Sequence, residues 1–174
     1  MPIKPPRKLD ADELRQYAMK LLSSRALSIG EFKARLRLRA ADPASIDEIV
    51  LQLKEYGALN DQRYAGHFAE RRAGSGSVGR QRVLSDLMRK KVAPKVAEKA
   101  VSEAYAGTDE VAMVEQWLER KYRNQDLGAL LQDPAKLASV FRRLRQAGFS
   151  TSPSIRVLKR YAIEAEQLED MSEE

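Results

Sequence analysis

"QYAMKLLSSR" (residues 16–25) recurs with substitutions as "RYAGHFAERR" (residues 63–72), and this repeat decides how the whole chain is interpreted. The alignment places Tyr17 over Tyr64, with an alanine following each tyrosine. The two copies are just under fifty residues apart. A repeat of this length is typical of a tandem array of helical units.

Shorter matches follow in the same order after each copy. "SIG" (residues 28–30) corresponds to "SVG" (residues 77–79), just after the repeated helix. Further along, "KKVAP" (residues 90–94) corresponds to "AGFST" (residues 147–151), at the predicted joint between the middle and closing helices of a unit. This common order favours true repeats over a chance likeness between amphipathic helices.

The apolar periodicity indicates helices in almost every segment. Apolar residues recur every three or four positions, without the sustained alternation that is typical of a β-strand. Ser28 and Glu31 have the spacing of a capping box, in which each side chain accepts a hydrogen bond from a backbone N–H of the first turn. Asp42-Pro43 and Asp133-Pro134 predict further helix starts, where proline's missing N–H has no cost.

We therefore predict an all-α fold, an elongated tandem array of three three-helix units with about nine helices. The predicted organisation is a disordered basic tail (1–9), unit 1 (10–57), unit 2 (58–106), a more diverged unit 3 (107–168) that includes Ala165, and an acidic tail (169–174).

The composition excludes several classes of protein. The chain has no cysteine and its only histidine is His67, so disulfides and the usual zinc or Cys–His sites cannot form. It has no run of the roughly 18 apolar residues that a membrane span needs. We expect a cytoplasmic monomer that is not an enzyme and uses no metal and no small-molecule cofactor. The net charge of +6 favours an acidic partner.

A complete G-x-G-x-x-G motif is present in "GSGSVG" (residues 74–79). In a dinucleotide-binding loop this motif follows a β-strand, but here it follows a segment with helical spacing. We therefore interpret it as a connector between two helices, with Ser77 as a candidate cap for the second. The start of that second helix, beside Arg80, remains a candidate place for an anion.

Positive charge is concentrated in the middle of the chain. Ten Lys or Arg residues lie between Arg63 and Lys99, against three acidic residues. On the predicted helix at 79–91, Arg82 and Arg89 lie on the side opposite the apolar stripe. The alternative is that these side chains only make an exposed helix face soluble in water and bind no partner. The candidate partner-binding or nucleic-acid-binding residues are Arg71, Arg72, Arg80, Arg82, Arg89, Lys90, Lys91 and Lys95.

Residues 58–101 contain a set of short motifs in a fixed order and spacing: Leu59-Asn60-Asp61, Arg63-Tyr64-Ala65, Phe68, Arg71, Gly79, Arg82, Leu84, Leu87 and Lys91-Val92. This order and spacing resemble the RecX family, regulators of the recombinase RecA. The likeness is weaker over residues 10–57 and faint after residue 107.

The resemblance implies a regulatory protein that binds the RecA–DNA filament. Such a protein would limit filament extension, ATP hydrolysis, strand exchange and the co-protease activity that induces the SOS response, and so modulate recombination and DNA repair. Single- or double-stranded DNA is a further candidate partner. The alternative function is direct DNA binding, in which unit 2 acts as a helix-turn-helix-like module and the helix at 79–91 enters the groove.

Overall fold

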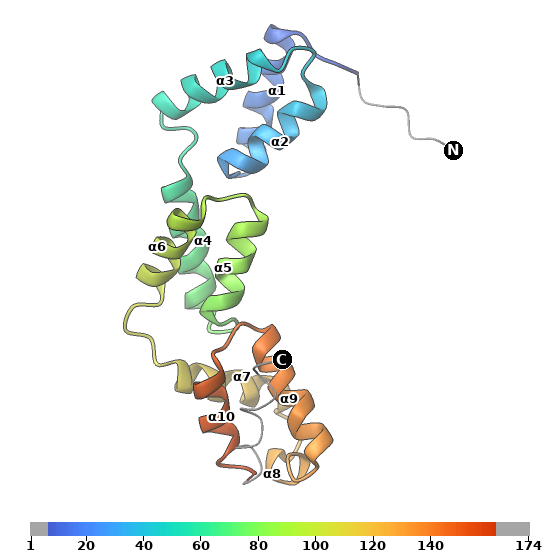
Figure 1. Cartoon of the computed structure of the whole chain (residues 1–174), viewed down its shortest axis with the longest axis vertical. Coiled ribbons are helices and arrows are strands. Elements are labelled where there is room, and N and C mark those ends of the chain that lie inside the picture. The colour runs from blue at the N-terminus through green and yellow to red at the C-terminus, as the bar shows by residue number, and fades with distance from the viewer. Residues whose placement is uncertain (1–6, 163–174) are drawn as a thin grey trace, which may run out of the picture. The chain divides into compact units, whose positions relative to one another are not determined.

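The computed structural model describes residues 7–162, and most of this part of the chain is helical (Figure 1). Within these residues no β-strand forms, and the β-type contact is one isolated bridge between Leu9 and Ala40. The all-α prediction is therefore confirmed, with the four-residue α8 added to the nine expected helices. The helices are α1 (Ala11–Ser24), α2 (Ile29–Arg39), α3 (Ala44–Glu55), α4 (Asp61–Gly74), α5 (Arg80–Arg89), α6 (Pro94–Ala104), α7 (Glu110–Tyr122), α8 (Leu127–Leu130), α9 (Pro134–Gln146) and α10 (Thr151–Leu158).

The chain divides into two compact units, and α4, α5 and α6 each contribute residues to both. The first compact unit contains the described residues up to His67 together with Leu87–Ala100. The second compact unit contains Phe68–Asp86 and the described residues from Val101 onward. The division into three three-helix units, with boundaries after residues 57 and 106, stays a prediction.

In the first compact unit, α1, α2 and α3 pack around a common apolar core (Figure 1). Leu14, Phe32 and Leu36 are completely buried, and each lies on the apolar stripe of its helix. Asp10 begins α1 with a capping box that includes Glu13, which satisfies backbone donors of the first turn. Burial of one face on each helix thus holds the three together.

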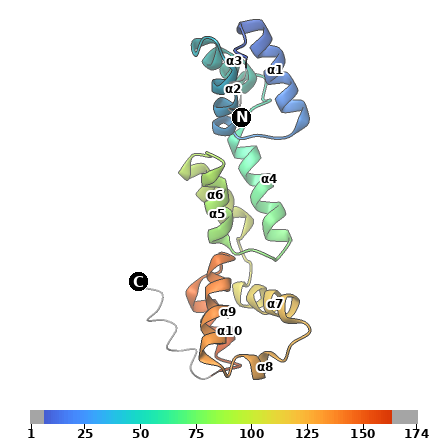
Figure 2. The ribbon, with the colours of Figure 1, turned by 90° about the vertical axis from the view of Figure 1, so that its right-hand side faces the viewer.

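In the second compact unit, α10 packs on both α7 and α9 (Figure 2). Val114, Leu144 and Leu158 are completely buried in this core. Asp133 caps α9 and Pro134 is its first residue, as the Asp-Pro pair predicted. The ring of Trp117 meets the ring of Phe149 edge-on, with centroids 6.4 Å apart, a favourable aromatic geometry.

The two predicted tails fall largely on residues that the structure does not describe. Residues 1–6 and 163–174, including Ala165 and the acidic tail at 169–174, lie outside the described residues. The prediction of a disordered tail up to residue 9 is wrong for Leu9. Leu9 is buried, and its amide donates to the Arg39 carbonyl at 2.7 Å while its carbonyl accepts from the Ala41 amide at 2.9 Å.

The S-x-G motif at residues 28–30 contacts the turn after α5, and we call this contact the first joint. The buried Ser28 hydroxyl accepts from the Glu31 amide at 3.0 Å and donates to the Lys90 carbonyl. The Ser28 half of the predicted capping box is therefore confirmed. The predicted hydrogen bond from a backbone amide to Glu31 is wrong. Glu31 Oε1 instead lies 3.7 Å from Lys90 Nζ, so the carboxylate forms an ion pair across the joint.

Gly30 allows the first joint to close. A Cβ atom added at Gly30 would overlap both the Cβ and the carbonyl of Lys91. Lys91 itself has a φ of 58°, the one positive φ among the described non-glycine residues. A left-handed lysine costs about 1–2 kcal/mol in backbone strain, so the packing against Gly30 must compensate for it.

Asp61 completes the first joint from the first turn of α4. Its Oδ1 accepts from the Ile29 amide at 2.8 Å, which satisfies a donor at the start of α2. Burial raises the pKa of Asp61, while the Ile29 hydrogen bond and the charge of Lys54 act in the opposite direction. The charged carboxylate is thus tolerated because it satisfies the start of α2.

The second S-x-G motif, at residues 77–79, forms an equivalent contact with the turn after α9, and we call this the second joint. The Gly79 amide donates to the Ala147 carbonyl at 2.8 Å, and the Gln81 amide donates to the Gly148 carbonyl at 3.2 Å. A Cβ at Gly79 would overlap the Gly148 carbonyl. Gly148 has a φ of 92°, so it occupies the place that Lys91 has in the first joint. This agrees with the correspondence of "KKVAP" and "AGFST".

Candidate functional site

The glycine motif connects α4 to α5, as the sequence predicted. Gly74 ends α4, and Gly76 turns the chain with a φ of 58°. Arg120 of α7 donates to the Ser75 carbonyl at 3.2 Å and to the Gly76 carbonyl at 2.5 Å. The loop therefore presents carbonyl groups to an arginine, whereas a phosphate-binding loop presents amides to an anion.

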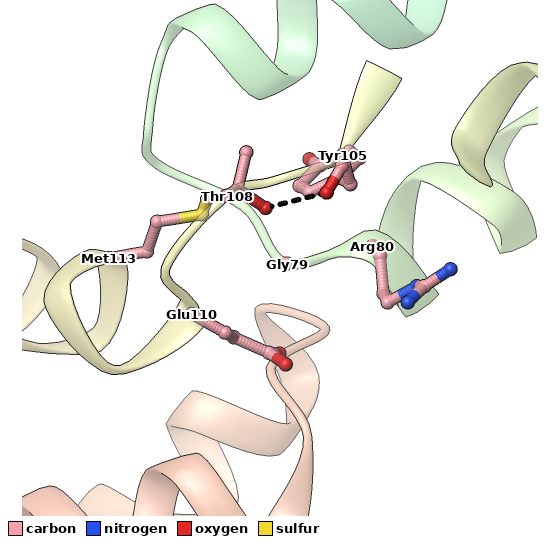
Figure 3. A pocket seen from close by; sticks show the side chains of 6 residues that line it. All are labelled: Gly79, Arg80, Tyr105, Thr108, Glu110 and Met113. Atoms are coloured by element: carbon pink, nitrogen blue, oxygen red, sulfur yellow. Dashed lines mark hydrogen bonds between the residues drawn. The ribbon is translucent and has the colours of Figure 1, made fainter. Parts of the chain in front are cut away.

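The N-terminus of α5 does not offer the anion site that we predicted beside Arg80. Its amides at Gly79 and Gln81 already donate to carbonyls of the second joint. The pocket at this position has a volume of about 70 Å³, and Glu110 and Tyr105 are among the residues that line it (Figure 3). The Tyr105 hydroxyl donates to the Val78 carbonyl at 2.9 Å. A carboxylate disfavours an anion, so the prediction is wrong.

Ser77 does not cap α5 either. The helix begins at Arg80, so Gly79 is the preceding residue and Ser77 lies two positions further back. The Ser77 hydroxyl is 2.8 Å from the Ser75 hydroxyl, within the connector itself. The repeat of Ser28 by Ser77 in the sequence is therefore not a repeat of the same hydrogen bonds.

Four of the predicted basic site residues belong to the second compact unit: Arg71, Arg72, Arg80 and Arg82. Two of them share one acid, Asp86, which is buried. Arg82 Nε lies 3.3 Å from Asp86 Oδ1, and Arg72 Nη2 lies 3.6 Å from Asp86 Oδ2. The side chains of Arg82 and Arg72 remain 45% and 42% exposed. Asp86 thus fixes the two arginines while leaving them accessible.

The sequence carries a sign of this arrangement. Asp86 is the single acidic residue between Arg71 and Lys95. An isolated acid among many basic residues is a candidate partner for several of them. Its burial, however, depends on the contact between α4 and α5, which periodicity cannot predict.

The other four predicted residues belong to the first compact unit: Arg89, Lys90, Lys91 and Lys95. Lys90 and Lys91 form part of the first joint, through the Lys90 carbonyl and ammonium and the left-handed backbone of Lys91. Their role is therefore partly structural. Arg89, Lys91 and Lys95 are exposed.

Four of the eight candidates combine exposure with freedom from acidic partners. Within residues 7–162, no carboxylate lies within 4.0 Å of the charged groups of Arg71, Arg80, Lys91 or Lys95. Arg71, Arg80, Lys91 and Lys95 are all exposed. An acidic partner can neutralise these charges without first breaking an ion pair. That all eight residues act as one surface stays a prediction.

The surroundings of α5 argue against its use as a DNA-recognition helix. Such a helix places its N-terminal residues against base edges in the major groove. Here the turn after α9 covers the start of α5, since a Cβ at Gly148 would overlap the backbone of Arg82. Arg82 also donates to the Gln146 carbonyl at 3.3 Å. The α9 turn would have to leave before this end of α5 could approach a base pair.

The fold and these contacts define a class: an all-α protein built from repeated helical joints, with exposed basic side chains suited to an acidic partner. No helix among residues 7–162 is long and apolar enough to cross a membrane. A family model described as "RecX, second three-helix domain" matches residues 60–101. A "Regulatory protein RecX" of Pseudomonas putida is 32% identical over 78% of this chain and 83% of that protein. The chain belongs to the RecX family.

Other relatives agree with this assignment. A "Regulatory protein RecX" of Caldanaerobacter subterraneus is 30% identical, over 65% of this chain and 57% of that protein's length. A crystal structure of RecX from Lactobacillus salivarius superposes with a TM-score of 0.66. It is 20% identical and covers 87% of this chain and 96% of that chain, which shows a common fold. The relatives are named as regulatory proteins rather than as enzymes.

Proposed function

We propose that this protein binds the RecA–DNA nucleoprotein filament and inhibits RecA. The activities lowered would be filament extension, ATP hydrolysis, strand exchange and the co-protease activity that induces the SOS response. The observation that carries the proposal is the 32% identity to a "Regulatory protein RecX" across 83% of its length. In this proposal the chain acts in the cytoplasm as a monomer, without a cofactor and without catalysis of its own.

The exposed basic residues support this proposal. Arg71 and Arg80 in one compact unit, and Lys91 and Lys95 in the other, are exposed and have no acidic partner among the described residues. A filament offers both phosphate and acidic protein surface to such groups. Three tandem three-helix units, which we retain as part of the proposal, would let one chain contact neighbouring RecA protomers.

The test of the proposal is RecA ATPase on single-stranded DNA with increasing amounts of this protein. We expect inhibition well below one molecule per RecA protomer, because a bound molecule that blocks extension affects many protomers. Unchanged ATPase activity at equimolar protein would contradict the proposal. Tight binding to bare duplex DNA, together with no binding to RecA filaments, would instead favour the helix-turn-helix function.

The basic site is tested by Arg71→Glu combined with Arg80→Glu. Neither side chain has an ion pair within the described residues, so stability should change little while inhibition weakens. Lys121→Glu combined with Arg123→Glu is the matched control, because these exposed residues lie outside the predicted site and change the net charge equally. Equal loss in the two double variants would mean that net charge alone, and not this site, attracts the filament.

A further inference from the structure

A pocket in the first compact unit lies outside both joints. It has a volume of about 220 Å³. Its apolar walls come from the end of α1 and the following link, with Leu22, Ala26 and Leu27, and from the link before α4, with Ala58. Pockets for whole small-molecule ligands usually measure about 300–1,000 Å³. This pocket suits a single apolar side chain.

The polar part of the pocket comes from the start of α4 and includes the charged guanidinium of Arg63. Asn60, Arg63, Tyr64 and His67 line it from the start of α4, and none of the eight described lining residues is acidic. The Asn60 side-chain oxygen is used by the Arg63 amide at 2.9 Å, which leaves the NH₂ group of Asn60 as a donor. The Arg63 guanidinium and the Asn60 NH₂ group therefore offer donors beside the apolar walls of the pocket.

Arg63 also joins the pocket to an exposed aromatic residue. Its Nη2 donates to the Gly57 carbonyl at 2.6 Å, which holds the turn containing Tyr56 and Ala58. Tyr56, next to this bonded glycine, is 83% exposed. Exposed aromatic residues are enriched at protein interfaces, where they bury a large area with little loss of side-chain entropy. Tyr56 and the pocket residue Ala58 therefore flank the glycine that Arg63 binds.

The chemistry of the pocket favours a protein occupant over a nucleobase. The donors and acceptors of a base that faced the alkyl groups of Leu22 and Leu27 would have no partner there, which is unfavourable for buried polar groups. An apolar side chain leaves no such group. A carboxylate next to that side chain would meet Arg63 and Asn60 at the rim.

We propose that this pocket receives one apolar side chain from an acidic segment of the partner protein, with a neighbouring carboxylate bound by Arg63. The inference rests on the proposed function, because the partner is taken to be the protein component of the RecA filament. The pocket does not include any of the eight candidate residues named from the sequence between Arg71 and Lys95, which would attract an acidic partner by charge alone.

The proposal is tested by a variant that places a large side chain at the edge of the pocket. Ala58→Phe places a ring where the partner side chain would enter, and Ala58 is exposed, so folding should be retained. Ala44→Phe, at the exposed start of α3, is the matched control. Binding of each protein to RecA filaments on single-stranded DNA is measured by co-sedimentation, with circular dichroism to verify folding. We expect about tenfold weaker binding for Ala58→Phe and little change for Ala44→Phe.

Two charge-reversal variants test whether Arg63 binds a carboxylate of the partner. Arg63→Glu should weaken filament binding more than Lys20→Glu, an equal change of charge on an exposed residue of α1 outside the pocket. An equal loss of filament binding in the two variants would contradict the proposal that Arg63 binds a carboxylate of the partner.

The outcomes separate this inference from the proposed function. If the unmodified protein binds filaments and Ala58→Phe binds equally well, the pocket is not a docking site and the proposed function stands. If the unmodified protein does not bind filaments at all, both proposals fall. If Ala58→Phe weakens binding to RecA-free oligonucleotide as much as binding to filaments, the occupant is nucleic acid and the protein assignment is overturned.

Discussion

The two joints achieve the same contact with different chemical groups. Each places the glycine of an S-x-G motif against a left-handed residue that follows a middle helix. In the second joint that residue is Gly148, and the absence of two Cβ atoms lets main-chain amides and carbonyls bond directly. In the first joint it is Lys91, and the Ser28 hydroxyl and Asp61 carboxylate supply the described hydrogen bonds. The same backbone arrangement is thus held by main-chain hydrogen bonds in the second joint and by side-chain hydrogen bonds in the first.

The largest effect is expected for Gly148→Ala in the second joint. The new Cβ would overlap the backbone of Arg82 and also strain a φ of 92°, so the free energy of unfolding should fall by about 3 kcal/mol. Urea denaturation followed by circular dichroism measures the change. Gly107→Ala is the matched control, because Gly107 has a φ of 71° but nothing within 4 Å of an added Cβ. Equal losses for the two would show that strain alone matters and that the joint is loose.

Ser28→Ala should destabilise the first joint by about 2 kcal/mol, because it removes a helix cap and leaves the Lys90 carbonyl without its described donor. Ser77→Ala is the corresponding change in the second motif. It should cost under about 0.5 kcal/mol, since Ser77 bonds only within an exposed connector. Thermal unfolding of both variants checks this contrast, and similar melting temperatures would contradict the difference between the joints.

Lys91→Gly should make the first joint resemble the second and stabilise the protein. Glycine removes the strain of the positive φ, although it also increases the entropy of the unfolded chain, so the net gain should be about 0.5 kcal/mol. The comparison is with Lys95→Gly in the first turn of α6, which should destabilise by about 0.5 kcal/mol because glycine raises the entropy of the unfolded chain. A loss of stability in Lys91→Gly would mean that the lysine side chain itself holds the joint.

The smallest effect is expected for Asp61→Asn. Burial raises the pKa of Asp61 above its ordinary value of 3.8, so the folded state binds more protons just above that pH. This group therefore lowers stability as pH rises from 3.8 through its folded pKa. Asparagine keeps an acceptor for the Ile29 amide and has no such titration. In denaturation experiments from pH 3 to 7, the free energy of unfolding of the variant should rise relative to that of the unmodified protein as pH increases. A difference that stays constant with pH would show that the buried charge of Asp61 does not affect stability.

The sequence was informative where a local rule governs the structure. Helix starts at Asp133-Pro134 and Ser28 followed from capping chemistry, which depends on neighbouring residues only. The connector at Gly74–Gly79 was interpreted correctly because strand and helix have different apolar periods. The Glu31 carboxylate and the Ser77 hydroxyl were assigned wrongly by the same local rules. Their actual partners, Lys90 for Glu31 and Ser75 for Ser77, were not the backbone amides that capping predicts.

By itself the sequence determined that the chain is helical and repetitive, since amphipathic period, caps and motif order are properties of neighbouring residues. Only the tertiary structure decided which basic side chains are paired and which remain open, because Asp86 reaches Arg72 from another helix. It also decided that the Gly79 and Gln81 amides at the start of α5 are occupied, since their acceptors at Ala147 and Gly148 lie more than sixty residues away in the chain. Such long-range contacts depend on how helices pack, and no local pattern specifies them.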